Sequence, residues 1–183
     1  MPRNDTHRPG AINPTEYSFV SIQYSKDMDE WPPLAHFQQE LFASHRKATG
    51  GSFSTHDHGG SCHVCGAHAL YTCIFHHEPT NDYIVTGFEC ADTLDAGATQ
   101  GLTDLRSRYR KAVSDVRKRQ AGKEKAKLLL EDHGLSRAWE LSLEKNPPHE
   151  WVRREHETLK DIVRKLAAYG GLSEPQYGYL ETL

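Results

Sequence analysis

The sequence has no long apolar run, a low share of apolar residues and no apolar segment at its start. Hydrophobic residues make up 37% of the 183 residues and aromatic residues 9%, so we expect a modest core with long solvated surfaces. No window approaches the roughly 18 apolar residues that a membrane span requires. The first ten residues, MPRNDTHRPG, lack the apolar stretch of a secretory signal. We therefore expect a cytoplasmic protein whose thiols stay reduced.

Cysteine is also scarce, with four residues in the chain. Two of them form the knuckle Cys62-His63-Val64-Cys65-Gly66, in which the two-residue spacing lets both sulfurs face one ion and the glycine permits a tight turn. Cys90 follows the second of two predicted strands, where the chain has returned to the base of a hairpin. Because zinc prefers four tetrahedral ligands at roughly 2.0–2.3 Å, this spacing predicts one structural zinc ion on Cys62, Cys65 and Cys90.

The residues alone leave the fourth zinc ligand open. Cys73, His76 and His77 lie on the first predicted strand, and alternation places Cys73 and His77 on the same face. A tight hairpin favours Cys73, which lies nearer the base, whereas His77 is better placed only if the strand ends early. His56 and His58, just before the knuckle, are further candidates.

The pattern along the chain predicts an α+β fold: a small zinc-bound β-hairpin finger with an N-terminal strand and helix, followed by a mostly α-helical C-terminal half. Residues 1–15 are polar and rich in proline, so we expect a flexible tail there. Residues 16–101 form the expected zinc-finger domain and residues 102–183 a helical region with a basic first helix. Strands are predicted over 16–24, 69–77 and 83–87, a loop over 52–61, and helices over 34–47, 90–94, 104–132, 136–145, 149–169 and from 174.

Charge is unevenly distributed, although the formal net charge is only −3. Residues 106–127 contain ten Lys or Arg and two acids, a local net charge of +8, so the remainder of the chain carries about −11. With so few acids, ion pairing along the helix does not account for this run. Cations on one helix match the phosphates of DNA or RNA, through backbone contacts that do not read bases. The predicted nucleic-acid-binding residues are Arg106, Arg108, Arg110, Lys111, Arg117, Lys118, Arg119 and Lys123.

Two further expectations concern the helical half. Trp139, Leu141 and Leu143 are expected to pack within a helical hairpin, and we favour that role over ligand stacking for the tryptophan. Gly122 is expected to weaken the long helix locally and to mark a bend.

The stretch from His56 to Leu94 resembles a group of small zinc-finger proteins common in tailed bacteriophages. The phrases that carry the resemblance are HDHGGSCHVCGA, YTCIFHHEPTNDYIVTG and ECADTL, and the later GLSEPQ is similar to an ending in such proteins. The layout resembles a treble-clef or ribbon-like finger. The resemblance implies a phage or prophage origin, a location in the host cytoplasm and nucleic-acid binding. It favours His77 as the fourth zinc ligand, beside Cys62, Cys65 and Cys90.

Three kinds of function were weighed for this chain. The one we favour is a non-enzymatic zinc-finger protein that binds nucleic acid through its basic helix, and the alternative is an adaptor that binds a host or phage protein. A zinc-dependent nuclease shares the treble-clef core, and His56-Asp57-His58 superficially suggests one. However, the ADTLDAG that follows Cys90 supplies no histidine or asparagine, and zinc held by three thiolates and a histidine has no open position for water. We therefore expect no catalysis.

Overall fold

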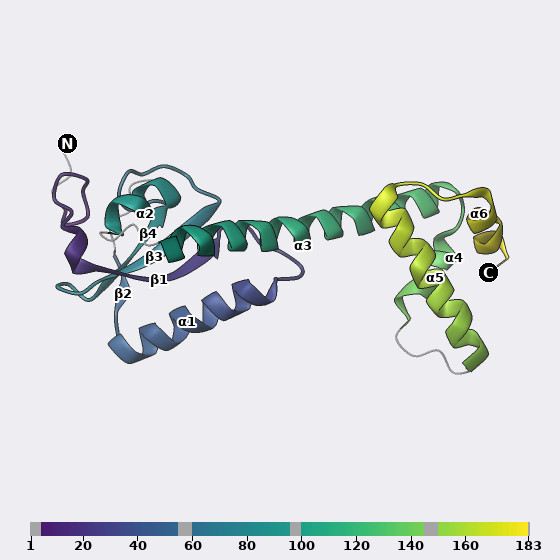
Figure 1. The fold of residues 1–183 in the computed structure, drawn as a ribbon, viewed down its shortest axis with the longest axis horizontal. Helices are drawn as coiled ribbons and strands as arrows, with labels where there is room; N and C mark the ends of the chain where they lie inside the picture. Colours follow the sequence, from purple (N-terminus) through teal and green to yellow (C-terminus); the bar gives the residue numbers. More distant parts are fainter. Residues whose placement is uncertain (1–4, 55–59, 96–99, 145–149, 183) are drawn as a thin grey trace. The chain divides into compact units, whose positions relative to one another are not determined.

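The computed structural model describes four stretches of the chain: residues 5–54, 60–95, 100–144 and 150–182. Over these stretches the protein is α+β and mostly helical, with six α-helices, a short 3-10 helix and one four-stranded sheet (Figure 1). The chain divides into two compact units, Met1–Ser114 and Asp115–Leu183. None of the helices in the described stretches combines the length and the apolar character needed to cross a membrane.

The division between the units lies inside the long helix α3 (Gln100–Asp132), after Ser114, whereas the sequence placed it between residues 101 and 102, at the start of that helix. The first part of α3 contributes Leu102, Tyr109 and Val113 to the core of the first unit. The first turns of α3 contribute to the core of one unit and its last turns to the core of the other. The hydrophobic pattern of the helix therefore does not assign it to a single domain.

The first unit is built on a sheet with the strand order β1-β3-β4-β2. Strands β1 (Tyr17–Tyr24), β3 (Tyr71–His77) and β4 (Asp82–Gly87) are antiparallel neighbours, and β2 (Ser52–Phe53) pairs in parallel with β4. The three predicted strands are therefore confirmed to within two residues. Strand β2 falls in the predicted loop, because two residues are too few to show the alternation that identifies a strand.

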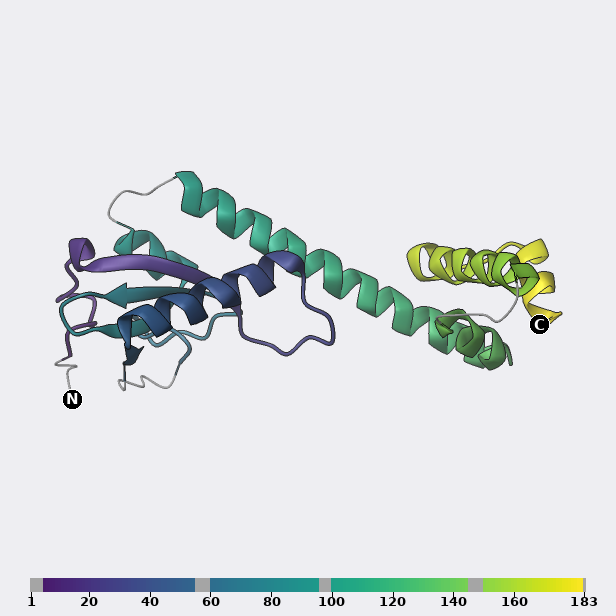
Figure 2. The ribbon, with the colours of Figure 1, turned by 90° about the horizontal axis from the view of Figure 1, so that it is seen from below.

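Helices lie on both faces of this sheet (Figures 1 and 2). Helix α1 (Pro33–Thr49) covers the face whose buried residues are Val20, Ile74 and Tyr83. Helix α2 (Phe88–Leu94) and the first part of α3 cover the other face, where the buried sheet residues are Ile22, Cys73, Phe75 and Ile84. The main core of the unit lies on this second face, beside the knuckle and the start of α2.

The segment before β1 packs against the sheet from Asp5 onward, which differs from the flexible tail expected over residues 1–15. His7 is only 2% exposed, and its Nδ1 atom lies 2.8 Å from the Tyr17 hydroxyl in a hydrogen bond. The side chain of Asp5 accepts a hydrogen bond from the His7 backbone N–H at 3.0 Å. The 3-10 helix Pro14–Glu16 then leads into β1. Composition did not reveal the burial of His7, because its contact with Tyr17 depends on the finished sheet.

The second unit is helical over its described residues and consists of the end of α3, α4 (Ser136–Leu143), α5 (Glu150–Tyr169) and α6 (Glu174–Glu181). Its own core contains Ala126, Leu130, Ala138, Leu159, Ile162, Val163, Leu166 and Leu180. Helix α3 is continuous through Gly122. A Cβ atom at Gly122 would lie 2.6 Å from the carbonyl oxygen of Ala167, so this glycine permits a close approach of α3 and α5.

Candidate metal centre

Three cysteine sulfurs gather at the base of the β3–β4 hairpin. The sulfur atoms of Cys62, Cys65 and Cys90 all lie within 4.8 Å of one another. Tetrahedral zinc with bonds of about 2.3 Å to sulfur requires separations of roughly 3.8 Å between the sulfurs, so a small closing movement accommodates an ion. No other group of three His, Cys, Asp or Glu side chains in the described stretches is this close. The structure therefore brings the three predicted cysteine ligands close enough together to bind a metal ion.

Backbone hydrogen bonds fold the knuckle and attach it to the sheet. The Gly66 N–H donates to the carbonyl of Cys62 at 2.9 Å, and Gly66 adopts a φ of 77°, which favours glycine. The His63 N–H donates to the carbonyl of Val85 in β4 at 2.7 Å. Cys90 lies in the first turn of α2, which begins where β4 ends. Strand β4 therefore positions both halves of the site.

The thiols of Cys62 and Cys90 differ in how easily they ionise. Cys62 is fully buried, and burial alone would raise the pKa of its thiol, but backbone hydrogen bonds from Cys65, Gly87 and Val64 outweigh this and lower that pKa. Burial, a hydrogen bond with Cys65 and the nearby charge of Cys62 raise the pKa of Cys90 to about 12. Because the charge on one sulfur opposes ionisation of the next, a divalent cation is the group that stabilises all three as thiolates. The donor set therefore fits a metal ion.

A cavity of about 350 Å³ opens beside the three sulfurs. Its lining also includes Tyr71, Phe88, His68, Glu89 and Arg110. The guanidinium group of Arg110 lies 4.6 Å from the centre of the Phe88 ring and 5.6 Å from that of Tyr71. The described residues thus supply three ligands and leave room next to them for a fourth.

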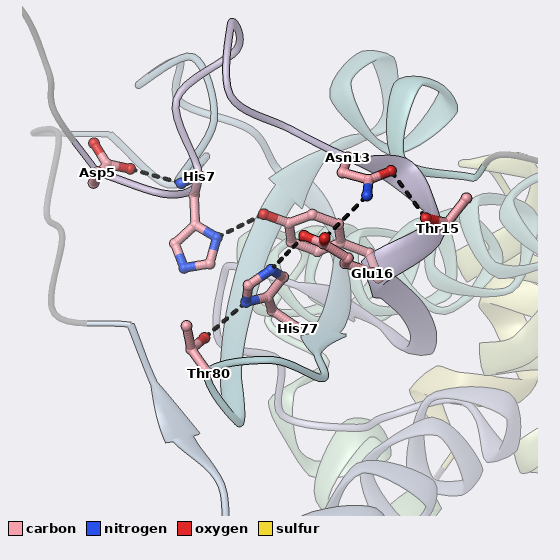
Figure 3. Close-up of polar contacts among 8 residues, drawn as sticks. Asp5, His7, Asn13, Thr15, Glu16, His77 and Thr80 are labelled. Carbon is pink, nitrogen blue, oxygen red and sulfur yellow. Dashed lines mark hydrogen bonds and ion pairs between the residues drawn. The ribbon is translucent and has the colours of Figure 1, made fainter.

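The structure does not bring His77 to the three cysteines. Thr72 pairs with Gly87 at the base of the hairpin, whereas His77 ends β3 at the turn, so five residues of strand, or roughly 16 Å, lie between them. Both ring nitrogens of His77 also have partners: Nδ1 lies 2.7 Å from the Thr80 hydroxyl and Nε2 lies 3.3 Å from a Glu16 carboxylate oxygen (Figure 3). His77 therefore holds a hydrogen-bonding position at the turn instead of the ligand position expected for it.

The other candidates for the fourth ligand are placed as follows. Cys73 is fully buried outside the three-sulfur group, and burial is the main cause that raises its pKa to about 12. His76 faces the opposite side of the sheet from His77, and its Nε2 atom lies 2.8 Å from the side-chain oxygen of Asn81. His56 and His58 lie outside the described residues.

Arg106, one of the predicted nucleic-acid-binding residues, is 9% exposed. Its guanidinium group donates to the carbonyl of Phe88 at 2.8 Å and pairs with the carboxylate of Asp92. Arg106 therefore joins α3 to α2 and is not available to a phosphate, which corrects its predicted role. The sequence contained the signal, because Arg106 lies four residues after Leu102 and three before Tyr109, within the apolar stripe of the helix.

The other seven predicted nucleic-acid-binding residues are exposed along α3: Arg108, Arg110, Lys111, Arg117, Lys118, Arg119 and Lys123. The first three belong to the first unit and the last four to the second. Arg110 is also engaged with the aromatic rings beside the cysteine cluster.

No family model, no curated protein and no solved structure matches this chain. The fold and the site define a class on their own: an α+β protein in which a knuckle and a hairpin bring three cysteines close enough together to bind a metal ion.

Proposed function

We propose that the protein is a non-enzymatic, zinc-organised protein that binds the backbone of DNA or RNA. One zinc ion on Cys62, Cys65 and Cys90 stabilises the first unit, and the exposed cations of α3 contact phosphates. The observation that carries the proposal is the cationic surface of α3 in the second unit, where four exposed cations lie within seven residues: Arg117, Lys118, Arg119 and Lys123.

Thiolate ligands support zinc as the ion and a structural role for it. Soft sulfur ligands select zinc over magnesium or calcium, which prefer oxygen. Zinc with three thiolates and a fourth protein ligand has no open coordination position, and such closed sites stabilise folds without activating water. We also propose, on the resemblance of the knuckle and hairpin alone, that the chain is phage-encoded and acts in the host cytoplasm.

Phosphate binding by this surface has a defined physical signature. Each phosphate that a cation neutralises releases counterions, so the affinity falls linearly with the logarithm of salt concentration, with a slope of about −0.9 per phosphate on duplex DNA. Contacts to phosphates carry no base information. The expected binding is therefore salt-sensitive and alike for unrelated sequences.

Charge reversal of three neighbouring cations tests the proposal. The triple variant Arg117→Glu, Lys118→Glu and Arg119→Glu changes exposed residues only, so we expect the fold to be kept. At low salt its affinity for two unrelated 20-base-pair duplexes and for one RNA strand should fall on the order of 100-fold, alike for all three, since several phosphate contacts are lost together. Fluorescence anisotropy across a salt series measures both the affinity and the slope.

The matched control is a triple reversal at exposed cations outside α3: Lys26→Glu, Arg46→Glu and Lys47→Glu. It changes the net charge by the same amount and should weaken binding by about threefold or less, since exposed charges outside the interface are largely screened. Equal losses in the two variants, or no binding by the unaltered protein at low salt, would show that α3 is not a nucleic-acid interface. The alternative function, an adaptor that binds another protein, is supported by a groove in the second unit.

A further inference from the structure

An open cavity of about 660 Å³ lies in the second unit between α3, α4 and α5, and we call it the α3–α5 groove. Its floor is apolar and consists of Trp139, Leu143, Val163, Ala167 and Ala168. Its rim is cationic and consists of Lys118, Arg119, Lys123, Lys160 and Arg164. Ser142 completes the lining, so no carboxylate is among the described residues that border the groove.

Leu143 shows that the floor is accessible. Its side chain is 61% exposed at the end of α4, whereas the sequence pattern predicted a packed position for it. Trp139 is half-buried and packs on the core of the unit with part of its ring. The close contact of Gly122 with Ala167 joins α3 to α5 beside this space. The groove is therefore an apolar surface with a supported base and an open side.

The floor offers little hydrogen bonding to a ligand. The Ser142 hydroxyl already donates to the carbonyl of Trp139 at 2.7 Å, and the other floor residues are aliphatic or the indole itself. A nucleobase placed here would leave the polar atoms on its edges without partners, at a cost of about 1–3 kcal/mol for each buried group. Aliphatic side chains have no such cost and gain from removal of apolar surface from water.

The rim selects the charge of the occupant. Arg164 pairs with Asp161 on its own helix, but Lys118, Arg119 and Lys160 form no ion pair among the described residues. These three cations around an apolar floor complement a ligand that carries carboxylates next to aliphatic groups.

We propose that the α3–α5 groove binds an acidic amphipathic helix of a partner protein. Aliphatic side chains at positions i, i+3 or i+4 and i+7 of that helix lie on the floor, and its glutamate or aspartate side chains reach the rim. The volume falls within the range of about 300–1,000 Å³ that is usual for ligand sites. The inference does not depend on nucleic-acid binding, although Lys118, Arg119 and Lys123 belong to both surfaces, so the two ligands compete.

A synthetic peptide tests the proposal with the full-length, metal-loaded protein. The probe is an 18-residue helix with leucines along one face and glutamates elsewhere, and its control is a scrambled peptide of the same composition that has no leucine face. We expect the amphipathic peptide to bind with a dissociation constant in the micromolar range and the scrambled one to bind at least about tenfold more weakly. Isothermal titration calorimetry measures both.

Variants then locate the binding site. Leu143→Glu places a carboxylate on the floor and should weaken binding of the peptide by about tenfold or more. Leu128→Glu is the matched control, because Leu128 is 56% exposed on α3 in the same unit but does not line the groove; it should change binding by about twofold or less. Lys160→Glu should also weaken binding of the peptide, because it replaces a rim cation with a carboxylate. Circular dichroism and melting curves check that each variant is folded.

Several outcomes would overturn the proposal. Equal binding of the two peptides would remove the amphipathic helix as the ligand, and equal losses for Leu143→Glu and Leu128→Glu would remove the groove as its site. Single-stranded oligonucleotides and phosphatidylglycerol vesicles are the competing occupants. If Leu143→Glu weakened either of these selectively and left the peptide unaffected, the groove would belong to that ligand. Loss of nucleic-acid binding in the α3 variants bears on the proposed function and leaves the peptide result standing.

Discussion

The two ends of the β3–β4 hairpin carry different chemistry. At the base, the sulfurs of Cys62, Cys65 and Cys90 lie together, and burial and the two neighbouring cysteines raise the pKa of Cys90. At the turn, His76 and His77 each have hydrogen-bond partners from the surrounding chain. The thiols at the base are therefore arranged to suit a cation, whereas the imidazoles at the turn already have hydrogen-bond partners. Residues of metal-binding type bind metal only where the fold brings them together with free lone pairs.

Removal of a sulfur at the base is the change with the largest expected effect. Cys62→Ser replaces a fully buried ligand, and structural zinc contributes about 10–16 kcal/mol to small fingers, more than most domains have in net stability. We expect the variant to lose its equimolar metal and the first unit to lose its cooperative melting transition. Elemental analysis and differential scanning calorimetry measure these two quantities.

Cys73→Ala is the control for that change, because Cys73 is equally buried on the same hairpin but outside the three-sulfur group. It should keep one metal ion per chain and lose about 1–2 kcal/mol of stability from the small cavity that it leaves. A Cys62→Ser protein with unchanged metal content and melting curve would show that the sulfur cluster is not a metal site.

The sequence predicted the base of the hairpin well, because its geometry is local. Two residues between Cys62 and Cys65 determine how their sulfurs turn, and a hairpin necessarily returns to its start, which places Cys90 near them. The position of His77 depends instead on the length of β3. Alternation tells which face a residue is on, but the distance along the strand decides whether it can reach an ion. The resemblance to phage zinc-finger proteins favoured His77 as a ligand, although its distance along β3 from the cysteines is too large.

The fold shows the same division between local and tertiary information. The longer strands and all six helices follow patterns of several residues, and the structure has them close to the predicted bounds. Strand β2 has two residues, and the role of Gly122 depends on a carbonyl of α5. The burial of Arg106 was missed for a different reason: a count of charges along residues 106–127 does not distinguish the face of the helix that packs from the face that water reaches.

Removal of the imidazole at the turn should have an intermediate effect. His77→Ala deletes hydrogen bonds with Thr80 and Glu16 and ring contacts with Tyr17 and His7, whose ring centres lie 4.6 and 5.2 Å away. We expect the free energy of unfolding to fall by about 2–4 kcal/mol, with one metal ion per chain retained. Urea denaturation and elemental analysis test the two parts separately. Loss of the metal in the His77→Ala protein would show that His77 is a metal ligand and that the turn belongs to the metal site.

The smallest expected effect concerns acid stability on the other sheet face of the same turn. His45 of α1 lies 5.2 Å from His76 between ring centres, and its Nδ1 atom lies 2.7 Å from the Tyr83 hydroxyl. Burial first, and then the charge of His76, lower the pKa of His45 from 6.5. The unfolded chain therefore takes up this proton more readily than the folded one, so the contribution is present above pH 6.5 and is lost as the pH falls below that value.

The urea concentration at the unfolding midpoint of the first unit should accordingly decrease when the pH is lowered from 7.5 to 5.5. The decrease should be smaller in His45→Gln, which removes the titrating group but keeps a polar side chain near Tyr83. Acid also weakens any thiolate–metal site. The comparison therefore needs a control variant that changes neither the His45 imidazole nor the cysteine cluster. His36→Gln serves, because His36 is exposed on the same helix, and its fall should equal that of the unaltered protein. If His45→Gln fell by the same amount as well, the acid sensitivity would belong to the base of the hairpin and not to its turn.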